Sequence, residues 1–262
     1  MIEVNNLFFN REKKNIFEKL SLFIEKEKIT AIMGPSGCGK TTLLKLISNQ
    51  IKHYNGVIKI KGKDIRCFSK NEMYELRKDI GILFQNGALF SDLTVYKNVA
   101  FPIEEHTDFS KSLIRDLVLM KLQSVGLRKA WGLMPAQLSI GMAKRVALAR
   151  AIALDPSIIM YDEPFAGQDP LSMSILIKLI NLLNKFSRMT TVIVSHDIHE
   201  TLEIADYVYI INERKIIAEG TVDEIRSNND DFVQSFVHMK INYDETNEFL
   251  TEGYEKTLLF DK

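Results

Sequence analysis

One glycine-rich loop constrains this chain more than any other feature. Residues 34–41 read Gly-Pro-Ser-Gly-Cys-Gly-Lys-Thr and satisfy the phosphate-binding pattern G-x-x-x-x-G-K-[ST] at every required position. A mostly apolar segment, 28–33, precedes the loop as a short buried strand, and the spacing of 42–47 predicts a helix directly after it. Glycines let backbone N–H groups crowd around an anion, and the positive end of a helix favours negative charge there. The sequence therefore predicts a nucleoside triphosphate site.

Each residue of this loop has an expected role at the nucleotide. The Lys40 ammonium is expected to reach the β- and γ-phosphates, and the Thr41 hydroxyl to bind Mg²⁺. Cys38 is interpreted as a small filler residue rather than a redox sensor. The residues of this segment expected to bind ATP are Gly34, Pro35, Ser36, Gly37, Cys38, Gly39, Lys40, Thr41 and Thr42.

Charge and composition narrow the class of protein. The chain has 262 residues, of which 34 are Lys or Arg and 34 are Asp or Glu. This balance gives no global field that would attract nucleic acid, so we expect no nucleic-acid partner. No apolar run approaches the ~18–20 residues of a membrane span, and the first residues do not resemble a secretory signal. Because the two cysteines also fit a reducing compartment, we expect a cytosolic protein that reaches a membrane only through a partner.

The order of apolar and helical segments predicts an α/β fold. Strands are expected at 80–84, 157–161 and 190–195, and helices at 69–78, 110–125, 174–186 and 197–205, with a largely helical insert from 86 to about 139. Alternating strands and helices predict a mostly parallel sheet covered on both faces. Hairpin-like pairs at 4–22, at 57–62 after an Asn55-Gly56 turn, and at 208–211 with 215–219 predict antiparallel strands beside that sheet.

Two carboxylates follow one of the buried strands. Residues 158–163 read Ile-Ile-Met-Tyr-Asp-Glu. A strand end beside a phosphate loop is where Mg²⁺ needs a ligand, and Asp162 suits that role. Glu163 suits polarisation of the attacking water, because phosphoryl transfer mostly requires positioning and charge stabilisation.

These motifs, with four more in the expected order, make the chain resemble the nucleotide-binding subunit of an ABC transporter. Leu138-Ser139-Ile140-Gly141-Met142 is similar to the signature segment L-S-G-G-Q, Gln85 falls at the Q-loop, Asp169 at the D-loop and His196 at the switch histidine. The resemblance covers residues 1–238 as one ATPase domain. It implies a RecA-like P-loop NTPase core with a mostly parallel sheet, an antiparallel β subdomain, and a helical subdomain inserted at about 86–150.

The resemblance also implies a mechanism. Two copies would close head to tail around two ATP molecules, and Ser139 and Gly141 of one copy would face the γ-phosphate held by the other. Gln85 would sense metal and water, joining Thr41 and Asp162 as metal-binding residues. The catalytic residues would be Glu163, His196 and Gln85, because His196 would steady both the γ-phosphate and Glu163. Asp169 would tie the two sites together.

Two positions depart from the family pattern. Ile140 stands where the family prefers glycine, and we expect it to have an ordinary negative φ, since a positive φ would strain a β-branched residue. Arg11 stands where an adenine-stacking aromatic is expected, because Phe9 is predicted to point into the core. A guanidinium can stack on a base, so Arg11 is a candidate adenine contact, with a solvated surface arginine as the alternative.

A finer resemblance is to the ATPases of the Mla (maintenance of lipid asymmetry) system. It rests on residues 84–95, 104–107 and 141–150 and on Gly167-Gln168-Asp169-Pro170, where most relatives carry S-A-L-D. It implies ATP-driven movement of phospholipid between the inner and outer membranes, with the chain at the cytoplasmic face of the inner membrane. The implied partners are a second copy, an integral membrane permease, a small STAS-like cytoplasmic subunit and a periplasmic MCE lipid-binding protein. The alternative is an importer ATPase for a small solute such as an amino acid or a metal.

Two surfaces are predicted to meet partners. Phe90, Leu93 and Tyr96, in the segment 86–96, are candidates to receive a coupling helix of the permease, with burial in the helical insert as the alternative. The tail at 239–262 is acidic yet punctuated by aromatic residues. It is interpreted either as a docking segment for a partner or a second copy, or as a disordered or self-packed end.

Overall fold

The core of the computed structural model, which describes residues 1–11, 14–52 and 55–238, is a sheet of mostly parallel strands. Its order is β10-β9-β3-β8-β7-β6, and the pairs among β9, β3, β8, β7 and β6 are parallel, whereas β10 is antiparallel to β9. The strands are β3 (Ile29–Met33), β6 (Ile80–Leu83), β7 (Ile158–Asp162), β8 (Thr190–Ser195), β9 (Tyr207–Asn212) and β10 (Lys215–Gly220). Every residue of β3, β7 and β8 is buried, which explains their nearly continuous apolar runs. The predicted α/β class and parallel sheet are confirmed.

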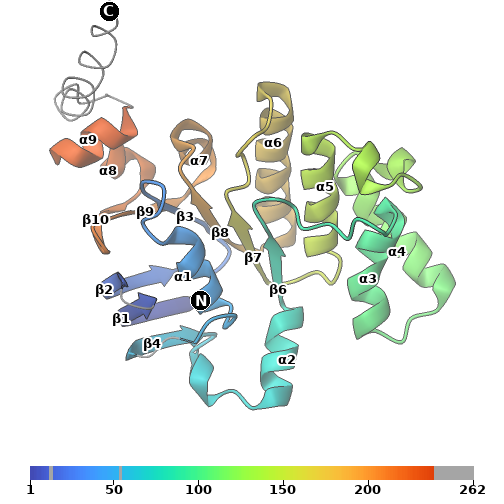
Figure 1. Cartoon of the computed structure of the whole chain (residues 1–262), viewed down its shortest axis with the longest axis horizontal. Coiled ribbons are helices and arrows are strands. Elements are labelled where there is room, and N and C mark those ends of the chain that lie inside the picture. The colour runs from blue at the N-terminus through green and yellow to red at the C-terminus, as the bar shows by residue number, and fades with distance from the viewer. Residues whose placement is uncertain (12–13, 53–54, 239–262) are drawn as a thin grey trace, which may run out of the picture.

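A second, antiparallel sheet packs against the first through one helix. Its order is β2-β1-β4-β5, formed by β1 (Ile2–Arg11), β2 (Lys14–Ile24), β4 (Asn55–Ile60) and β5 (Lys63–Asp64). Helix α1 (Lys40–Ile47) lies between the two sheets, and its leucines and Ile47 join one apolar cluster with residues from both (Figure 1). The phosphate loop at the start of α1 is thereby fixed between two layers.

One predicted turn is wrong. Asn55 and Gly56 lie inside β4, and the strand pairs with β1. Gly56 has φ 90°, and a Cβ there would come within 2.4 Å of the Asn6 carbonyl oxygen. The glycine therefore serves a close approach of two strands rather than a reversal of the chain.

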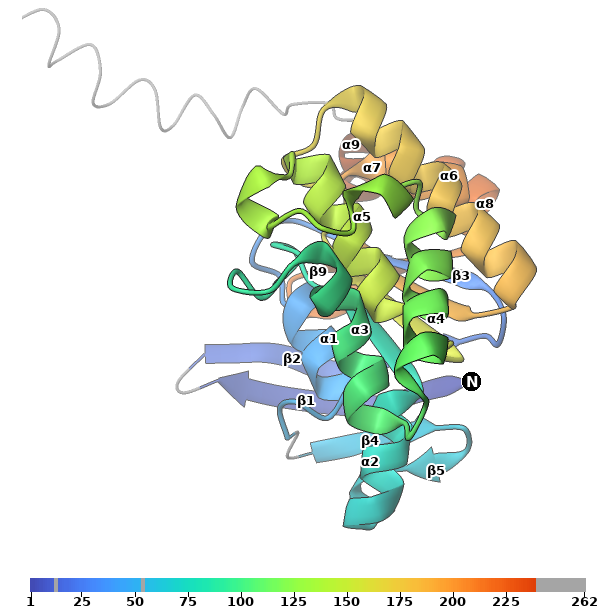
Figure 2. The ribbon, with the colours of Figure 1, turned by 90° about the vertical axis from the view of Figure 1, so that its right-hand side faces the viewer.

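The remaining helices cover the core sheet and build the insert. They are α2 (Lys70–Lys78), α3 (Val95–His106), α4 (Lys111–Ser124), α5 (Ile140–Ala151), α6 (Pro170–Ser187), α7 (Ile198–Ile204), α8 (Val222–Arg226) and α9 (Asp231–Val237), with 3₁₀ turns at Ile65–Cys67, Arg128–Ala130 and Pro135–Gln137. Helices α3, α4 and α5 gather on one side of the molecule (Figure 2), and their apolar residues join one core cluster with α6 and the sheet. Residues 86–94, which we predicted as helical, form turns before α3.

Capping residues explain where several helices begin. Ser69 and Glu72 form a capping box at the start of α2, and Ser110 caps α4. Helix α6 begins four residues earlier than predicted, because Asp169 caps it and Pro170 occupies its first turn. None of the helices in the described ranges combines the length and the apolarity of a membrane span. The tail at 239–262 lies outside the described residues.

Candidate nucleotide site

The phosphate loop has the conformation that its glycines predict. Gly37 and Gly39 have φ values of 82° and 106°, in the region that favours glycine. A Cβ at residue 39 would also lie 2.8 Å from Ile16 Cγ2 and from Phe17 Cζ. The loop therefore passes directly beneath the β1–β2 hairpin, and glycine is required at residue 39 for both conformation and space.

Lys40 is a buried cation at the centre of the loop. Lys40 is only 4% exposed. Its Nζ donates to the carbonyl oxygens of Gly34 at 2.8 Å and Pro35 at 3.1 Å. The same atom lies 3.4 Å from Glu163 Oε1, so the loop and the acidic strand end are joined by an ion pair. A positive charge is thus held where we predicted that the phosphates bind.

The helix start and the acidic strand also meet at a second point. Thr41 Oγ1 donates to Asp162 Oδ1 at 2.7 Å. The pKa of Asp162 lies above its usual value because the carboxyl group is buried. The hydrogen bond from Thr41 and the nearby lysines oppose this shift without cancelling it. A hydroxyl and a buried carboxylate side by side form a hard-oxygen donor set of the kind that Mg²⁺ prefers.

The next residue, Glu163, is held by the end of β8. Its Oε2 accepts hydrogen bonds from the His196 backbone N–H at 3.1 Å and from His196 Nδ1 at 2.8 Å. Glu163 has φ 47°, a strained conformation for a non-glycine residue. It is buried, whereas the His196 side chain is 44% exposed. The imidazole therefore orients the carboxylate from the open side of the site.

A buried lysine from the insert supports this strained turn. Lys144, on α5, donates from Nζ to the carbonyl oxygens of Glu163 at 3.0 Å and Pro164 at 2.8 Å. Gln168 Nε2 donates to the same Pro164 carbonyl at 2.7 Å. Burial lowers the pKa of Lys144, and the nearby carboxylates of Asp197, Glu163 and Asp162 oppose that shift. No sequence pattern singled out Lys144.

These groups open onto one cavity of about 380 Å³. Its lining contains most of the predicted site residues together with Ile16, which the sequence analysis missed. The lining residues are Arg11, Ile16, Ser36, Gly37, Gly39, Lys40, Thr41, Thr42, Gln85, Glu163 and His196. Segments as far apart in sequence as residues 11 and 196 thus converge on the phosphate loop.

Seven predicted site residues are not among the residues that line this cavity. Gly34, Pro35 and Cys38 belong to the phosphate loop itself, and Asp162 is bonded to Thr41. The other three are Ser139, Gly141 and Asp169. Ser139 caps α5 and accepts from Met142 N at 3.2 Å, and Asp169 caps α6. Gly141 is buried against α6, and a Cβ there would lie 2.4 Å from Ser172 Oγ. This arrangement agrees with their predicted role toward a second copy, which stays a prediction.

Two smaller expectations can be compared with the structure. Phe9 is 4% exposed and belongs to the core, as predicted, while Arg11 is exposed at the end of β1. Contact of Arg11 with adenine stays a prediction. Burial raises the pKa of the Cys38 thiol, which keeps it protonated and agrees with the filler interpretation.

Ile140 has the ordinary φ that we predicted, because it is the first residue of α5 and is not among the residues with positive φ. It is 62% exposed, and Leu171, in the first turn of α6, is 73% exposed. The structure thus gives Ile140 little part in the core.

We expect Ile140→Gly to change the ATPase rate while the protein still folds. An exposed Ile→Gly exchange in a helix costs no more than about 1 kcal/mol, whereas the lost side chain would relieve crowding at the partner's γ-phosphate. Thermal unfolding and steady-state ATPase assays on the same preparation would check both parts. A variant that fails to fold would contradict the expectation.

Residues 17–166 match the ABC transporter family model, so the chain belongs to the ABC transporter family and is an ABC-type ATPase that binds ATP. It is similar to the intermembrane phospholipid transport system ATP-binding protein MlaF of Haemophilus influenzae, with 55% identity over 237 residues, 90% of either chain. MlaF of Escherichia coli K12 is 48% identical over 90% of this chain and 88% of that protein. A dimeric structure of the ATP-binding cassette MJ0796 bound to ADP and Pi has a TM-score of 0.77 at 28% identity, covering 85% of this chain and 99% of that one. The family resemblance seen in the sequence is confirmed.

Proposed function

We propose that this chain is the ATP-hydrolysing subunit of a membrane transporter that moves phospholipid between the inner and outer membranes. The observation that carries the ATPase part is that Lys40, Thr41 and the Glu163–His196 pair line one cavity, with Asp162 hydrogen-bonded to Thr41. The phospholipid part is supported by the identity with MlaF over 90% of both chains.

The geometry suits hydrolysis of a phosphoanhydride by water. Lys40 and the loop N–H groups bind the phosphates and spread their charge. Glu163 accepts a proton from the attacking water, and its Oε2 is fixed by two hydrogen bonds from His196. Gln85, at the cavity rim, positions that water. Together these residues supply positioning and charge stabilisation, which is what phosphoryl transfer requires.

The residues present also fit Mg²⁺. Thr41, Asp162 and Gln85 offer a hydroxyl, a carboxylate and an amide oxygen at one side of the phosphate loop. When bound there, Mg²⁺ would neutralise part of the charge on the phosphates. The two carboxylates would then have different roles: Asp162 would bind the metal, and Glu163 would accept the proton of the attacking water.

We propose that two copies work head to tail. Ser139, Gly141 and Asp169 do not line the cavity of their own chain, yet they lie at the starts of α5 and α6, where helix N-termini favour an anion. Each copy would contribute this edge to the nucleotide of the other. The dimeric MJ0796 cassette, with its TM-score of 0.77, supports such a pair.

A groove beside the insert is the proposed seat of the permease. It has a volume of about 380 Å³, and the rings of Phe90 and Phe101, both 40% exposed, lie 4.9 Å apart at its edge. The Arg150 guanidinium lies 5.5 Å from the Phe90 ring. Of the three side chains predicted to receive a coupling helix, Phe90 lines this groove, whereas Leu93 and Tyr96 are half-buried and do not.

One buried amide shapes the turn that presents Phe90. Asn98, fully buried on α3, accepts from Phe90 N at 2.8 Å. Its Nδ2 lies 3.1 Å from the Phe90 carbonyl oxygen, 3.0 Å from that of Leu93 and 3.1 Å from that of Thr94. The turn is therefore tied to α3 by a single side chain.

The experiment that tests the proposal isolates the chain with whatever it binds in the membrane. A tagged chain purified from solubilised membranes is expected to bring down the permease, the STAS-like subunit and the MCE protein, together with bound phospholipid detectable by mass spectrometry. ATP turnover of this complex should depend on added phospholipid. A complex that instead contains a soluble binding protein and an amino acid or metal would support the importer alternative.

A further inference from the structure

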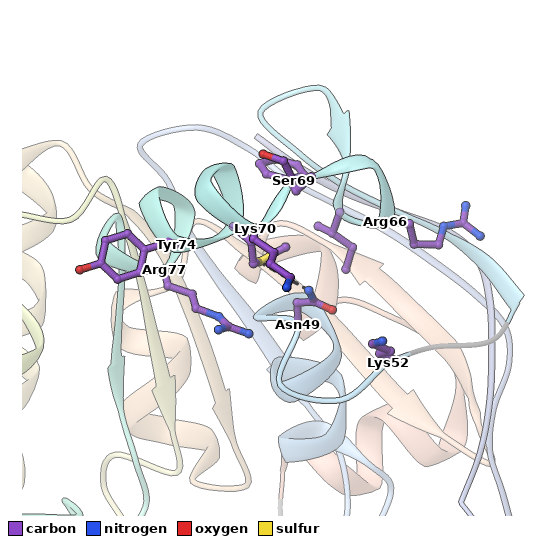
Figure 3. A pocket seen from close by; sticks show the side chains of 10 residues that line it. Asn49, Lys52, Arg66, Ser69, Lys70, Tyr74 and Arg77 are labelled. Carbon is purple, nitrogen blue, oxygen red and sulfur yellow. Dashed lines mark hydrogen bonds between the residues drawn. The ribbon is translucent and has the colours of Figure 1, made fainter.

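A cavity of about 620 Å³ lies at the end of α1 opposite the phosphate loop. Asn49 and Lys52 line it from the segment after α1, and α2 lines it with Lys70, Met73 and Arg77 (Figure 3). Because α1 has eight residues, at about 1.5 Å each, the cavity lies about 12 Å from the nucleotide site. It is therefore a separate feature of the molecule.

The described residues that line this cavity are basic, polar or apolar, and none of them is acidic. Lys70 and Arg77 project from α2 toward the segment that carries Asn49, and Lys52 lies farther along that segment, whereas Arg66 points away (Figure 3). Arg66 is paired with Asp64 at 2.6 Å. Lys52, Lys70 and Arg77, by contrast, form no ion pair with any residue in the described ranges.

The acidic residues of α2 are engaged elsewhere. Glu72 accepts from Lys63 Nζ at 2.6 Å and from the Ser69 backbone N–H at 2.9 Å. The contact with Lys63 and the capping bonds lower the pKa of Glu72 to about 2, so this carboxylate is ionised and committed to its own partners. Glu75 pairs with Lys78 at 2.8 Å. Among the residues that the structure describes, these three cations consequently share the cavity without a counter-charge.

The floor of the cavity is apolar. Ile65 is 2% exposed, and Met73 and Phe68 pack against the same core cluster. Cations above an apolar floor suit a ligand that carries a phosphate and an attached non-polar part.

The cavity adjoins the groove proposed for the permease. Arg77 lines both hollows, and the Tyr74 hydroxyl, from the cavity wall, lies 2.7 Å from Nδ1 of His106, in the groove. If a permease sits on that groove, the cavity faces the same bilayer; this step rests on the proposed function. The anionic lipids of a cytoplasmic leaflet attract lysines and arginines that lie close to its surface.

We propose that the cavity lined by Lys52, Lys70 and Arg77 binds a phosphate anion, supplied by the headgroup of an anionic phospholipid at the membrane surface. Lys52 and Lys70 line only this cavity and not the groove, so they can be changed without touching the permease seat. Both are also outside the ATP site.

The test compares two double variants of the full chain that change the net charge equally. Lys52→Glu/Lys70→Glu reverses two cations of the cavity. Lys178→Glu/Lys185→Glu reverses two exposed lysines of α6 that form no ion pair with another described residue. Co-sedimentation is measured with vesicles of phosphatidylcholine alone and with added phosphatidylglycerol, at saturating non-hydrolysable ATP analogue. At roughly fivefold per surface cation, the cavity variant should bind phosphatidylglycerol vesicles at least about 25-fold more weakly, while the α6 variant stays close to the unaltered chain.

Equal losses in both variants, or equal binding of the unaltered chain to both kinds of vesicle, would overturn the proposal. Inorganic phosphate that binds the unaltered chain but not the cavity variant, without any vesicle binding, would overturn the headgroup as the source. Basal ATPase, measured on the same preparations before the analogue is added, keeps the two proposals apart. If the cavity variant loses vesicle binding but keeps normal ATP turnover, the result supports the headgroup site. If the unaltered chain turns over ATP normally but does not bind vesicles, the headgroup site is overturned while the proposed ATPase function stands.

Discussion

Replacing Glu163 with glutamine is expected to lower ATP turnover by about 10²–10⁴-fold, the usual loss when a general base is removed. The amide oxygen can still accept both hydrogen bonds from His196, so the geometry of the site should survive while its proton acceptor is lost. ATP binding is therefore expected to remain, and ATP-bound pairs of chains should accumulate. Single-turnover ATPase assays and size-exclusion chromatography with ATP would measure the two effects.

Glu203→Gln provides the matched control, because it makes the same chemical change at an exposed position of α7. Its turnover should equal that of the unaltered chain. Near-normal hydrolysis in Glu163→Gln would remove Glu163 from its proposed role and would leave the Lys40 and Asp162 contacts as the only support for the site.

Lys144→Met is expected to lower kcat with little change in the KM for ATP. Lys144 donates to the backbone carbonyls of Glu163 and Pro164 and is not among the residues that line the nucleotide cavity. It is therefore expected to act by holding the strained turn and not by contact with nucleotide. A displacement of the carboxylate by about 1 Å can cost about 10²-fold in rate. The substitution also removes a buried hydrogen-bond donor from two carbonyl groups, and this loss should lower the free energy of unfolding by about 1–3 kcal/mol.

A second buried lysine separates these two effects. Lys121, on α4, is 6% exposed and is bonded to Asp155, away from the catalytic turn. Lys121→Met should leave kcat unchanged and lower the free energy of unfolding by no more than about 1 kcal/mol, because the Asp155 side chain is 77% exposed. If both variants lose activity only in proportion to their lost stability, Lys144 has no positioning role.

Much of the fold followed from local signals in the sequence. The strand 190–195 was predicted with its observed bounds, because a fully buried parallel strand is a continuous apolar run between polar ends. The helices predicted at 69–78 and 110–125 are likewise found within one residue of those bounds, as α2 and α4. The start of α6 was missed because the predicted helix relied on apolar periodicity, which appears only after its capped first turn.

The site residues that belong to a local sequence motif could be predicted. The residues that join the site through contacts with segments far away in the sequence could not. Lys40, Asp162 and Glu163 stand out because the loop and the acidic strand end are local patterns. Lys144 bonds carbonyls 19 and 20 residues away, and Ile16 reaches Gly39 from another sheet. Such contacts depend on tertiary packing, and the residues that neighbour Lys144 and Ile16 in the sequence give no signal of them.

The amide of Asn98 has a mechanical consequence. Because one side chain grips the turn at residues 90, 93 and 94, the turn cannot bend independently of α3. Movement of Phe90 is therefore expected to move α3 with it, so that a displacement at the groove is passed on to the helical insert.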